Sequence, residues 1–167
     1  MAPDSGMRTL VFPGTFDPIT ISHADLALRA RTLFDRVIVA VTQRGPEEPL
    51  DAVEARAELC RLALADMEGV EVDTFGGLLV DYLHSKGTNF VLRGMRTVAD
   101  FEYEFQRVDM TRQLDPEIEF VFFAPSENCA AISSTLVREI AAYGGDVREF
   151  LHPAVAKILM ARAEGAS

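Results

Sequence analysis

The sequence predicts an α/β protein with a doubly wound, five-stranded parallel sheet and a C-terminal helix. Short apolar runs rich in Val, Ile and Phe alternate with longer segments of helical periodicity. The runs are continuously apolar, as is typical of parallel strands covered on both faces. The length of 167 residues suits one domain. We place this domain at residues 8–162, between a disordered extension over 1–7 and a flexible tail over 163–167.

The first strand is expected at residues 8–12, RTLVF, which lead into a Pro-Gly turn. The apolar spacing of residues 22–34 predicts a helix with Ser22 as its possible N-cap. Residues 37–41, VIVAV, are entirely apolar and β-branched or small, which predicts the second strand.

A helix is expected over residues 51–67, because Asp51 and Glu54 have the spacing of a capping box. The third strand, VEVDTF at residues 70–75, is rich in β-branched and aromatic residues. It is followed by a Gly-Gly pair that breaks the strand.

The next helix covers residues 78–87 and ends at Gly87, which suits the left-handed position after a helix. The run NFVLR predicts a fourth strand at 89–93. A long helix over 98–113 and a fifth strand, IEFVFFA at 118–124, complete the alternation.

Two final helices follow the fifth strand. Ser133 or Ser134 is a suitable N-cap for the first, which is expected to stop at a Gly-Gly pair. Pro153 is a favourable first residue for the last helix.

Three unusual loops follow strands one, four and five: PGTFDPIT, RGMR and PSENCAAISS. Ligands of open α/β sheets bind beyond the carboxyl ends of the strands, where the strand order reverses. The loops can meet there only if strands one and four are neighbours. This requirement predicts the order 3-2-1-4-5.

Composition argues against several functional classes. The formal net charge of −10 disfavours nonspecific nucleic-acid binding. The two cysteines and three histidines are scattered, without the spacing of a metal site or disulfide. There is no secretion signal and no membrane-spanning run, so we expect a cytoplasmic protein with reduced thiols and no membrane partner.

The loops instead carry groups suited to anions. Gly14 permits close approach to the backbone, and Thr15 adds a hydroxyl. His23 lies in the first turn of a helix, whose free N–H groups favour phosphate. Arg93 and Arg96 offer planar forks for phosphate oxygens. Each group is also explained by a cap or a solvated turn, and only their joint placement at one edge favours a polyphosphate site.

Three segments resemble bacterial phosphopantetheine adenylyltransferase, a member of the nucleotidyltransferase superfamily. GTFDPITISH is similar to its first signature, of the form T-x-G-H, and ISSTLVR matches the second, I-S-S-T-x-x-R. RGMRTVADFEYEFQ resembles its RGLR-x-x-x-DFEYE segment. The similarity extends from about residue 8 to residue 161 and implies a Rossmann-like nucleotidyltransferase fold.

The resemblance implies an enzyme that transfers the adenylyl group of ATP to 4′-phosphopantetheine. The products are dephospho-coenzyme A and pyrophosphate, in the penultimate step of coenzyme A synthesis. The acceptor phosphate is already ionised, so neither a protein nucleophile nor a general base is needed. The resemblance also implies Mg²⁺ bound with the nucleotide, a homohexamer, and coenzyme A as a feedback ligand.

The resemblance assigns roles by position. His23, Thr15 and Arg96 would be catalytic. The acceptor site would contain Thr15, Arg44, Glu47, Leu79, Arg93 and Thr111. The nucleotide site would contain Gly14, Thr15, Phe16, His23, Gly94, Met95, Arg96, Glu104, Cys129, Ala130, Ala131, Ile132, Ser133, Ser134, Thr135 and Arg138. A buried, inert thiol is the alternative for Cys129.

Three positions depart from the family pattern. Ser22 replaces the glycine before the signature histidine, Glu47 replaces a lysine, and Thr111 replaces a common asparagine. Arg44 is close enough in sequence to supply the missing positive charge. Two alternatives therefore stay open: a different phosphate acceptor, or a regulatory relative that binds ATP without turnover.

Overall fold

The computed structural model describes residues 6–166, and its five strands form one parallel sheet in the order β3-β2-β1-β4-β5. The predicted fold class and strand order are confirmed. The strands are β1 (Thr9–Gly14), β2 (Arg36–Thr42), β3 (Val70–Phe75), β4 (Phe90–Gly94) and β5 (Glu119–Phe123). The helices are α1 (Ile21–Ala30), α2 (Leu50–Leu64), α3 (Leu79–Ser85), α4 (Val98–Leu114), α5 (Ser134–Ala142) and α6 (Pro153–Gly165).

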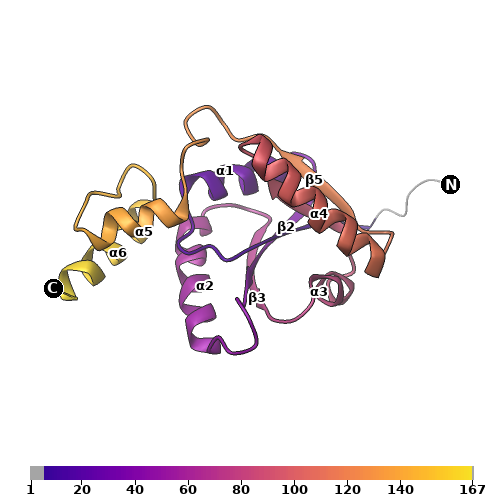
Figure 1. Ribbon diagram of the computed structural model, residues 1–167, viewed down its shortest axis with the longest axis horizontal. Helices are drawn as coiled ribbons and strands as arrows, with labels where there is room; N and C mark the ends of the chain where they lie inside the picture. Colours follow the sequence, from indigo (N-terminus) through magenta and orange to yellow (C-terminus); the bar gives the residue numbers. More distant parts are fainter. Residues whose placement is uncertain (1–5, 167) are drawn as a thin grey trace.

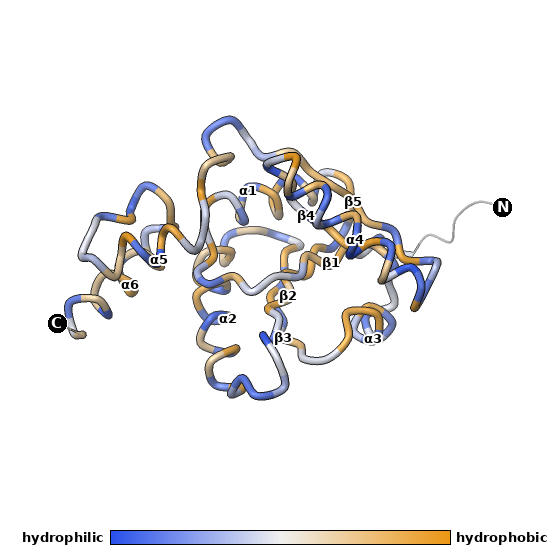
Figure 2. Tube along the Cα trace, in the orientation of Figure 1, coloured by the Kyte–Doolittle hydropathy of each residue, from blue (hydrophilic) through white to orange (hydrophobic). Residues whose placement is uncertain are grey.

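Apolar side chains cover both faces of the sheet. Successive strand residues point to opposite faces, so Leu10 and Phe12 join one buried cluster while Val11 joins the other. The first cluster includes residues of α1, α2, α5 and α6, and the second includes residues of α3. Helix α4 lies on the α3 face, where Phe105 stacks on Phe122 with ring centroids 6.2 Å apart. Figure 1 shows these helices around the sheet, and Figure 2 shows the hydrophobic strands at its centre.

The order of the strands brings distant loops together. Strand β1 pairs with β2 on one side and with β4 on the other. The loops after β1 and β4 therefore leave the sheet side by side, and the loop after β5 lies next to them because β5 pairs with β4. The predicted meeting of these loops at one edge is confirmed.

The start of α1 differs from the expectation. Thr20, not Ser22, is the N-cap, and its hydroxyl accepts a hydrogen bond from the backbone N–H of His23. Ser22 is instead buried inside the first turn. The helix ends at Ala30, before residue 34, because the chain turns there and buries the ring of Phe34.

The predicted capping box of α2 is also wrong. The helix begins at Leu50 with Pro49 as its N-cap, and no side chain caps it. Glu54 forms an ion pair with Arg61 further along the helix. The other helix ends agree with the sequence: Gly87 follows α3 with a positive φ of 66°, Ser133 caps α5 and Pro153 opens α6.

The described residues cover the proposed domain and part of its ends. Residues 1–5 of the predicted extension, and residue 167 of the predicted tail, lie outside them. Helix α6 includes residues 163–165. No helix within residues 6–166 is both long and apolar enough to cross a membrane.

Candidate functional site

A cavity of about 340 Å³ opens at the edge of the sheet where β1 and β4 end. Three loops and two helix N-termini contribute to it, as expected for a switch point of an open sheet. Its lining residues are Phe12, Pro13, Gly14, Thr15, Phe16, Thr20, Ser22, His23, Leu26, Arg93, Gly94, Met95, Arg96, Glu104, Pro125, Ile132, Ser133, Ser134 and Thr135. We call it the first cavity.

A second cavity of about 480 Å³ adjoins the first and has more apolar walls. The two share Pro13, Gly14, Thr15, Arg93 and Glu104 as a common wall. The other residues of the second cavity are Thr42, Phe75, Gly77, Leu78, Leu79, Arg107, Thr111 and Phe120. Two ligands bound side by side would therefore meet at the end of β1.

The loop after β1 has a fixed shape. Phe16 has a positive φ of 44°, and its buried ring packs edge-on against Phe12 with centroids 5.2 Å apart. A Cβ atom at Gly14 would lie 3.1 Å from the Phe16 ring. The folded-back ring therefore favours glycine here, since a Cβ would force the ring to shift by a few tenths of an ångström.

His23 is held in one orientation and one tautomer. Its Nδ1 atom lies 3.0 Å from the backbone nitrogen of Thr20, which can only donate. In the neutral ring the proton is therefore on Nε2. The pKa of His23 is lowered from 6.5 to about 4, mainly because the ring is buried and secondly because the charge of Arg96 is nearby. At neutral pH the ring is an uncharged N–H donor in the wall of the first cavity.

Arg96 joins the loops after β4 and β5. Its Nη1 atom donates to the carbonyl oxygen of Ile132 at 2.9 Å, and its Nε atom lies 3.8 Å from a carboxylate oxygen of Asp100. Two residues earlier, a Cβ atom at Gly94 would lie 2.7 Å from the Cδ1 atom of Leu26. A larger residue at this position would force the Leu26 side chain of α1 to move.

The N-terminus of α5 forms another part of the first cavity. Ser133 caps the helix by accepting a hydrogen bond from the backbone N–H of Leu136. The hydroxyl of Ser134 donates to the carbonyl oxygen of Pro18 at 2.8 Å, which ties α5 to the loop after β1. The free N–H groups of such a helix end favour a phosphate.

Arg93 and Glu104 form a two-pronged ion pair in the common wall. Nε and Nη2 of Arg93 donate to the two carboxylate oxygens at 2.9 and 2.8 Å, and Nη1 donates to the carbonyl oxygen of Pro13. Glu104 is buried, with only 7% of its surface exposed. The charge of Arg93 is thus compensated within the protein.

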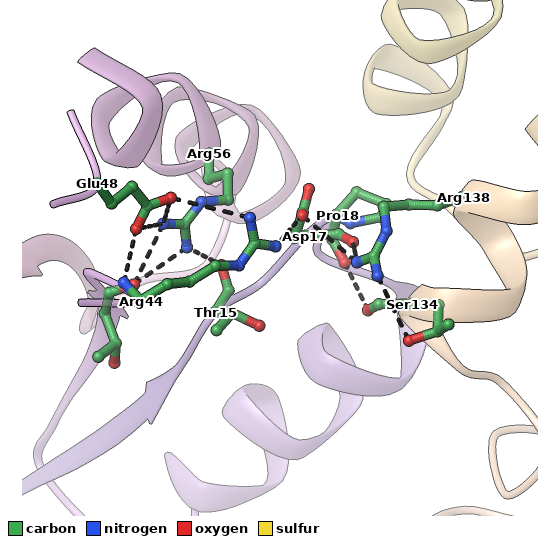
Figure 3. A network of polar contacts seen from close by, with 10 residues as sticks. Thr15, Asp17, Pro18, Arg44, Glu48, Arg56, Ser134 and Arg138 are labelled. Carbon is green, nitrogen blue, oxygen red and sulfur yellow. Dashed lines mark hydrogen bonds and ion pairs between the residues drawn. The ribbon is translucent and has the colours of Figure 1, made fainter. Parts of the chain in front are cut away.

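Behind the common wall, buried Arg56 holds the loops after β1 and β2 (Figure 3). Its guanidinium donates to the carbonyl oxygens of Thr15 and Thr42. It also bonds both carboxylate oxygens of Glu48, at 2.8 and 2.9 Å. The pKa of Glu48 is lowered, mainly because its carboxylate accepts a hydrogen bond from the backbone N–H of Arg44.

Asp17 continues this network toward α5 (Figure 3). Its carboxylate forms ion pairs with Arg44 and with Arg138, and its carbonyl oxygen accepts a hydrogen bond from Arg138. Both arginines are therefore turned toward this loop. Arg138 lies at the same edge of the sheet as His23 but contributes to neither cavity described here.

The first cavity contains most of the residues predicted for the nucleotide. Four predicted residues do not line it: Arg138 and the loop residues Cys129, Ala130 and Ala131. The Cys129 thiol is buried, and burial is the main cause that raises its pKa, as expected for an unreactive thiol.

Four residues predicted for the acceptor, Thr15, Leu79, Arg93 and Thr111, line the second cavity. The other two do not: Arg44 is paired with Asp17, and Glu47 is exposed in the turn after β2. The loop after β2 thus keeps both side chains outside the two cavities.

Several lining residues were missed by the sequence reasoning. Phe75 and Phe120 seemed to be ordinary strand residues, and Thr20 was hidden by the choice of Ser22 as the cap. Arg107 could have been found, because it lies three residues after Glu104 and four before Thr111, which is the spacing of one helix face. No group of His, Cys, Asp and Glu within residues 6–166 is arranged to hold a metal ion.

Comparisons with known proteins agree with this arrangement. Residues 11–140 match the model of the cytidylyltransferase-like family. The chain is 48% identical to the phosphopantetheine adenylyltransferase of Hahella chejuensis over 153 residues, which cover 92% of this chain and 95% of that protein. It is 50% identical to the phosphopantetheine adenylyltransferase of Thiobacillus denitrificans over 153 residues, covering 92% and 96%.

A solved structure shares the fold at low sequence identity. It comes from Vibrio parahaemolyticus and was assigned as a nicotinate-nucleotide adenylyltransferase. The TM-score is 0.61 with 16% identity, and the match covers 93% of this chain and 99% of that one. At this identity the likeness concerns the fold alone.

Proposed function

This chain belongs to the phosphopantetheine adenylyltransferases of the cytidylyltransferase-like family, and we propose that it transfers the adenylyl group of ATP to 4′-phosphopantetheine. The products are dephospho-coenzyme A and pyrophosphate. The observation that carries the proposal is the pair of adjoining cavities with Thr15 in their common wall. One has the helix end and N–H donors suited to a polyphosphate, and the other has the apolar walls suited to a pantetheine arm.

The reaction needs little covalent chemistry from the protein. An oxygen of the acceptor phosphate attacks the α-phosphorus of ATP and forms a new P–O bond. The bond between the α-phosphorus and the bridging oxygen breaks, and pyrophosphate leaves with the electron pair. The acceptor oxygen is already ionised at neutral pH, so the task of the site is orientation and stabilisation of charge.

His23 suits the role of charge stabiliser. Its Nε2–H is a donor at neutral pH, because the pKa of the ring is lowered to about 4. In the proposed reaction it donates to an oxygen of the α-phosphate as negative charge develops there. Thr15 holds the phosphate between the two substrates, and Arg96 adds positive charge on the nucleotide side.

The other nucleotide contacts follow from the first cavity. Gly94 and Met95 provide backbone beside the nucleotide, and residues 132–135 offer the N-terminus of α5 to its phosphates. Phe16 and Glu104 complete the wall. Arg138 reaches the phosphates in this proposal only by giving up its contacts with Asp17, and residues 129–131 serve as the loop that leads to the cavity.

The acceptor arm lies in the second cavity in this proposal, against Leu79 and Thr111. Arg93 contacts the arm while it remains paired with Glu104. Arg44 can approach the acceptor only by leaving Asp17, and Glu47 stays in solvent. Both therefore act on the acceptor through their long-range charge rather than by contact.

Mg²⁺ enters with ATP in this proposal and is held by the phosphates. Glu104 is the one acidic residue that lines the first cavity among the described residues, and it is already paired with Arg93. Coenzyme A includes the dephospho-coenzyme A part of the product, and it is the proposed feedback ligand.

We also propose a cytoplasmic homohexamer, on the strength of the family resemblance. Exposed apolar side chains on α4, including those of Phe101, Tyr103 and Met110, support self-association. Light scattering of the purified protein tests the number of subunits.

The decisive experiment measures pyrophosphate release from ATP with 4′-phosphopantetheine and with other phosphate acceptors. We expect turnover with 4′-phosphopantetheine and dephospho-coenzyme A as the product in mass spectrometry. Turnover with only another acceptor, such as nicotinate mononucleotide or glycerol phosphate, would contradict the acceptor. ATP binding without any turnover would indicate a regulatory relative.

A further inference from the structure

Arg107 stands in the second cavity as a cation without a counter-charge. It lies on α4 between Glu104 and Thr111, one helical turn of about 5.4 Å from each, and all three line the cavity. Within residues 6–166 its guanidinium has no hydrogen bond or ion pair, and it lies over the ring of Tyr103, 5.5 Å from the centroid. The exposed side chain can therefore turn toward a ligand.

The charges of the cavity wall add up to one uncompensated positive charge. The charged lining residues are Arg93, Glu104 and Arg107. The first two neutralise each other through a two-pronged ion pair. The remaining wall is neutral and includes Phe75, Leu79 and Phe120. On a chain with a net charge of −10, this lone cation beside apolar walls selects for an anion.

We propose that Arg107 binds the phosphate of the acceptor and makes the second cavity selective for phosphorylated acceptors. This inference rests on the proposed function, since it takes the second cavity as the acceptor site. Glu104 belongs to the wall shared with the first cavity, so Arg107 lies one turn from the place where the two substrates meet. A planar guanidinium donates two parallel hydrogen bonds to two phosphate oxygens.

The contact with Tyr103 leaves the charge of Arg107 available to a ligand. The cation–π contact to this exposed ring is weak and does not neutralise the charge of Arg107. The guanidinium can therefore leave the ring and turn to a phosphate in the second cavity. Lysine in its place keeps the charge but loses the bidentate geometry.

The test compares Arg107→Ala, Arg107→Lys and Lys157→Ala with the wild type. Lys157 is exposed on α6 and lines neither cavity, so Lys157→Ala changes the net charge equally without touching the site. For Arg107→Ala we expect a KM for 4′-phosphopantetheine about ten-fold higher, equivalent to about 1.4 kcal/mol, with the KM for ATP unchanged. Arg107→Lys recovers part of the loss, and Lys157→Ala behaves as wild type.

A second measurement identifies the group that Arg107 contacts. Unphosphorylated pantetheine is used as a competitive inhibitor of the wild type and Arg107→Ala. We expect equal inhibition constants, because the phosphate is missing from this ligand. An equal loss of affinity for both ligands would place Arg107 on the arm and overturn the proposal, as would an unchanged KM in Arg107→Ala.

These failures differ from failure of the proposed function. If the wild type does not turn over 4′-phosphopantetheine, the assigned reaction is wrong. If the wild type is active and the Arg107 variants match it, the reaction stands and only the role of Arg107 is wrong.

Discussion

The Nδ1 atom of His23 accepts a 3.0 Å hydrogen bond from the backbone N–H of Thr20, while the hydroxyl of Thr20 accepts one from the backbone N–H of His23. This is a capping box in which histidine takes the place usually held by Glu or Gln. The same contact that starts α1 leaves Nε2–H as the donor toward the first cavity. Helix capping and the proposed catalytic role thus depend on one side-chain orientation.

The low pKa of His23 predicts a stability change in acid. The folded-state pKa is about 4, against 6.5 for an ordinary histidine. Between these values the unfolded chain binds a proton that the folded chain does not, so stability falls as the pH drops from 6.5 to 4. At about 1.36 kcal/mol per pH unit, this contribution is at most about 3 kcal/mol. Urea unfolding at pH 7 and pH 4 should show a smaller loss in His23→Gln than in wild type. Equal losses would contradict the lowered pKa.

Replacement of His23 should also separate its catalytic and capping roles. His23→Ala removes the donor, and we expect kcat to fall about 10²-fold, as for loss of one oxyanion donor, with little change in ATP affinity. His23→Gln keeps an amide acceptor for Thr20 and an amide N–H, so it should retain more activity. Steady-state kinetics and ATP titration measure both effects. A near-normal kcat in His23→Ala would reduce the histidine to a helix cap.

Breaking the ion pair between Arg93 and Glu104 should destabilise the fold. Arg93→Ala leaves the buried carboxylate of Glu104 without its partner, and such a loss costs about 3 kcal/mol or more. Urea unfolding measures the change. The matched control is Arg36→Ala, which breaks a more exposed pair with Glu71 and should cost about 1 kcal/mol or less. A similar small cost for Arg93→Ala would show that the carboxylate is accessible to water.

The loop after β2 should affect the acceptor only through charge. Arg44 is bound to Asp17 and lies outside both cavities. Arg44→Ala should therefore raise the KM for 4′-phosphopantetheine by about three-fold or less, which is a smaller rise than for Arg107→Ala.

Glu47→Lys replaces a negative charge by a positive one and should lower the KM for 4′-phosphopantetheine or leave it unchanged. The same defect in Asp17→Asn and Arg44→Ala would show that Arg44 acts by holding the loop. Loss of activity in Glu47→Ala with a normal Arg44→Ala would reopen the choice of acceptor.

Local chemistry in the sequence was enough to predict the layout of the sheet and the edge that carries the site. Continuous apolar runs identified all five strands, and the position of the polar loops required β1 next to β4. Gly87 and Pro153 marked helix ends because φ preferences are local properties of the residue. The sequence also placed His23, Arg96 and Ser133 at one edge, where each of them lines the first cavity.

Only the tertiary structure decided which partner each charged side chain takes. Arg138 is bound to Asp17, 121 residues away along the chain, and Arg56 supports Thr15 from α2 across 41 residues. Such contacts depend on how helices and loops pack, which local propensity does not specify. For the same reason Arg93 and Arg107 look alike in sequence, whereas in the fold one is neutralised by Glu104 and the other is left with its charge facing the second cavity.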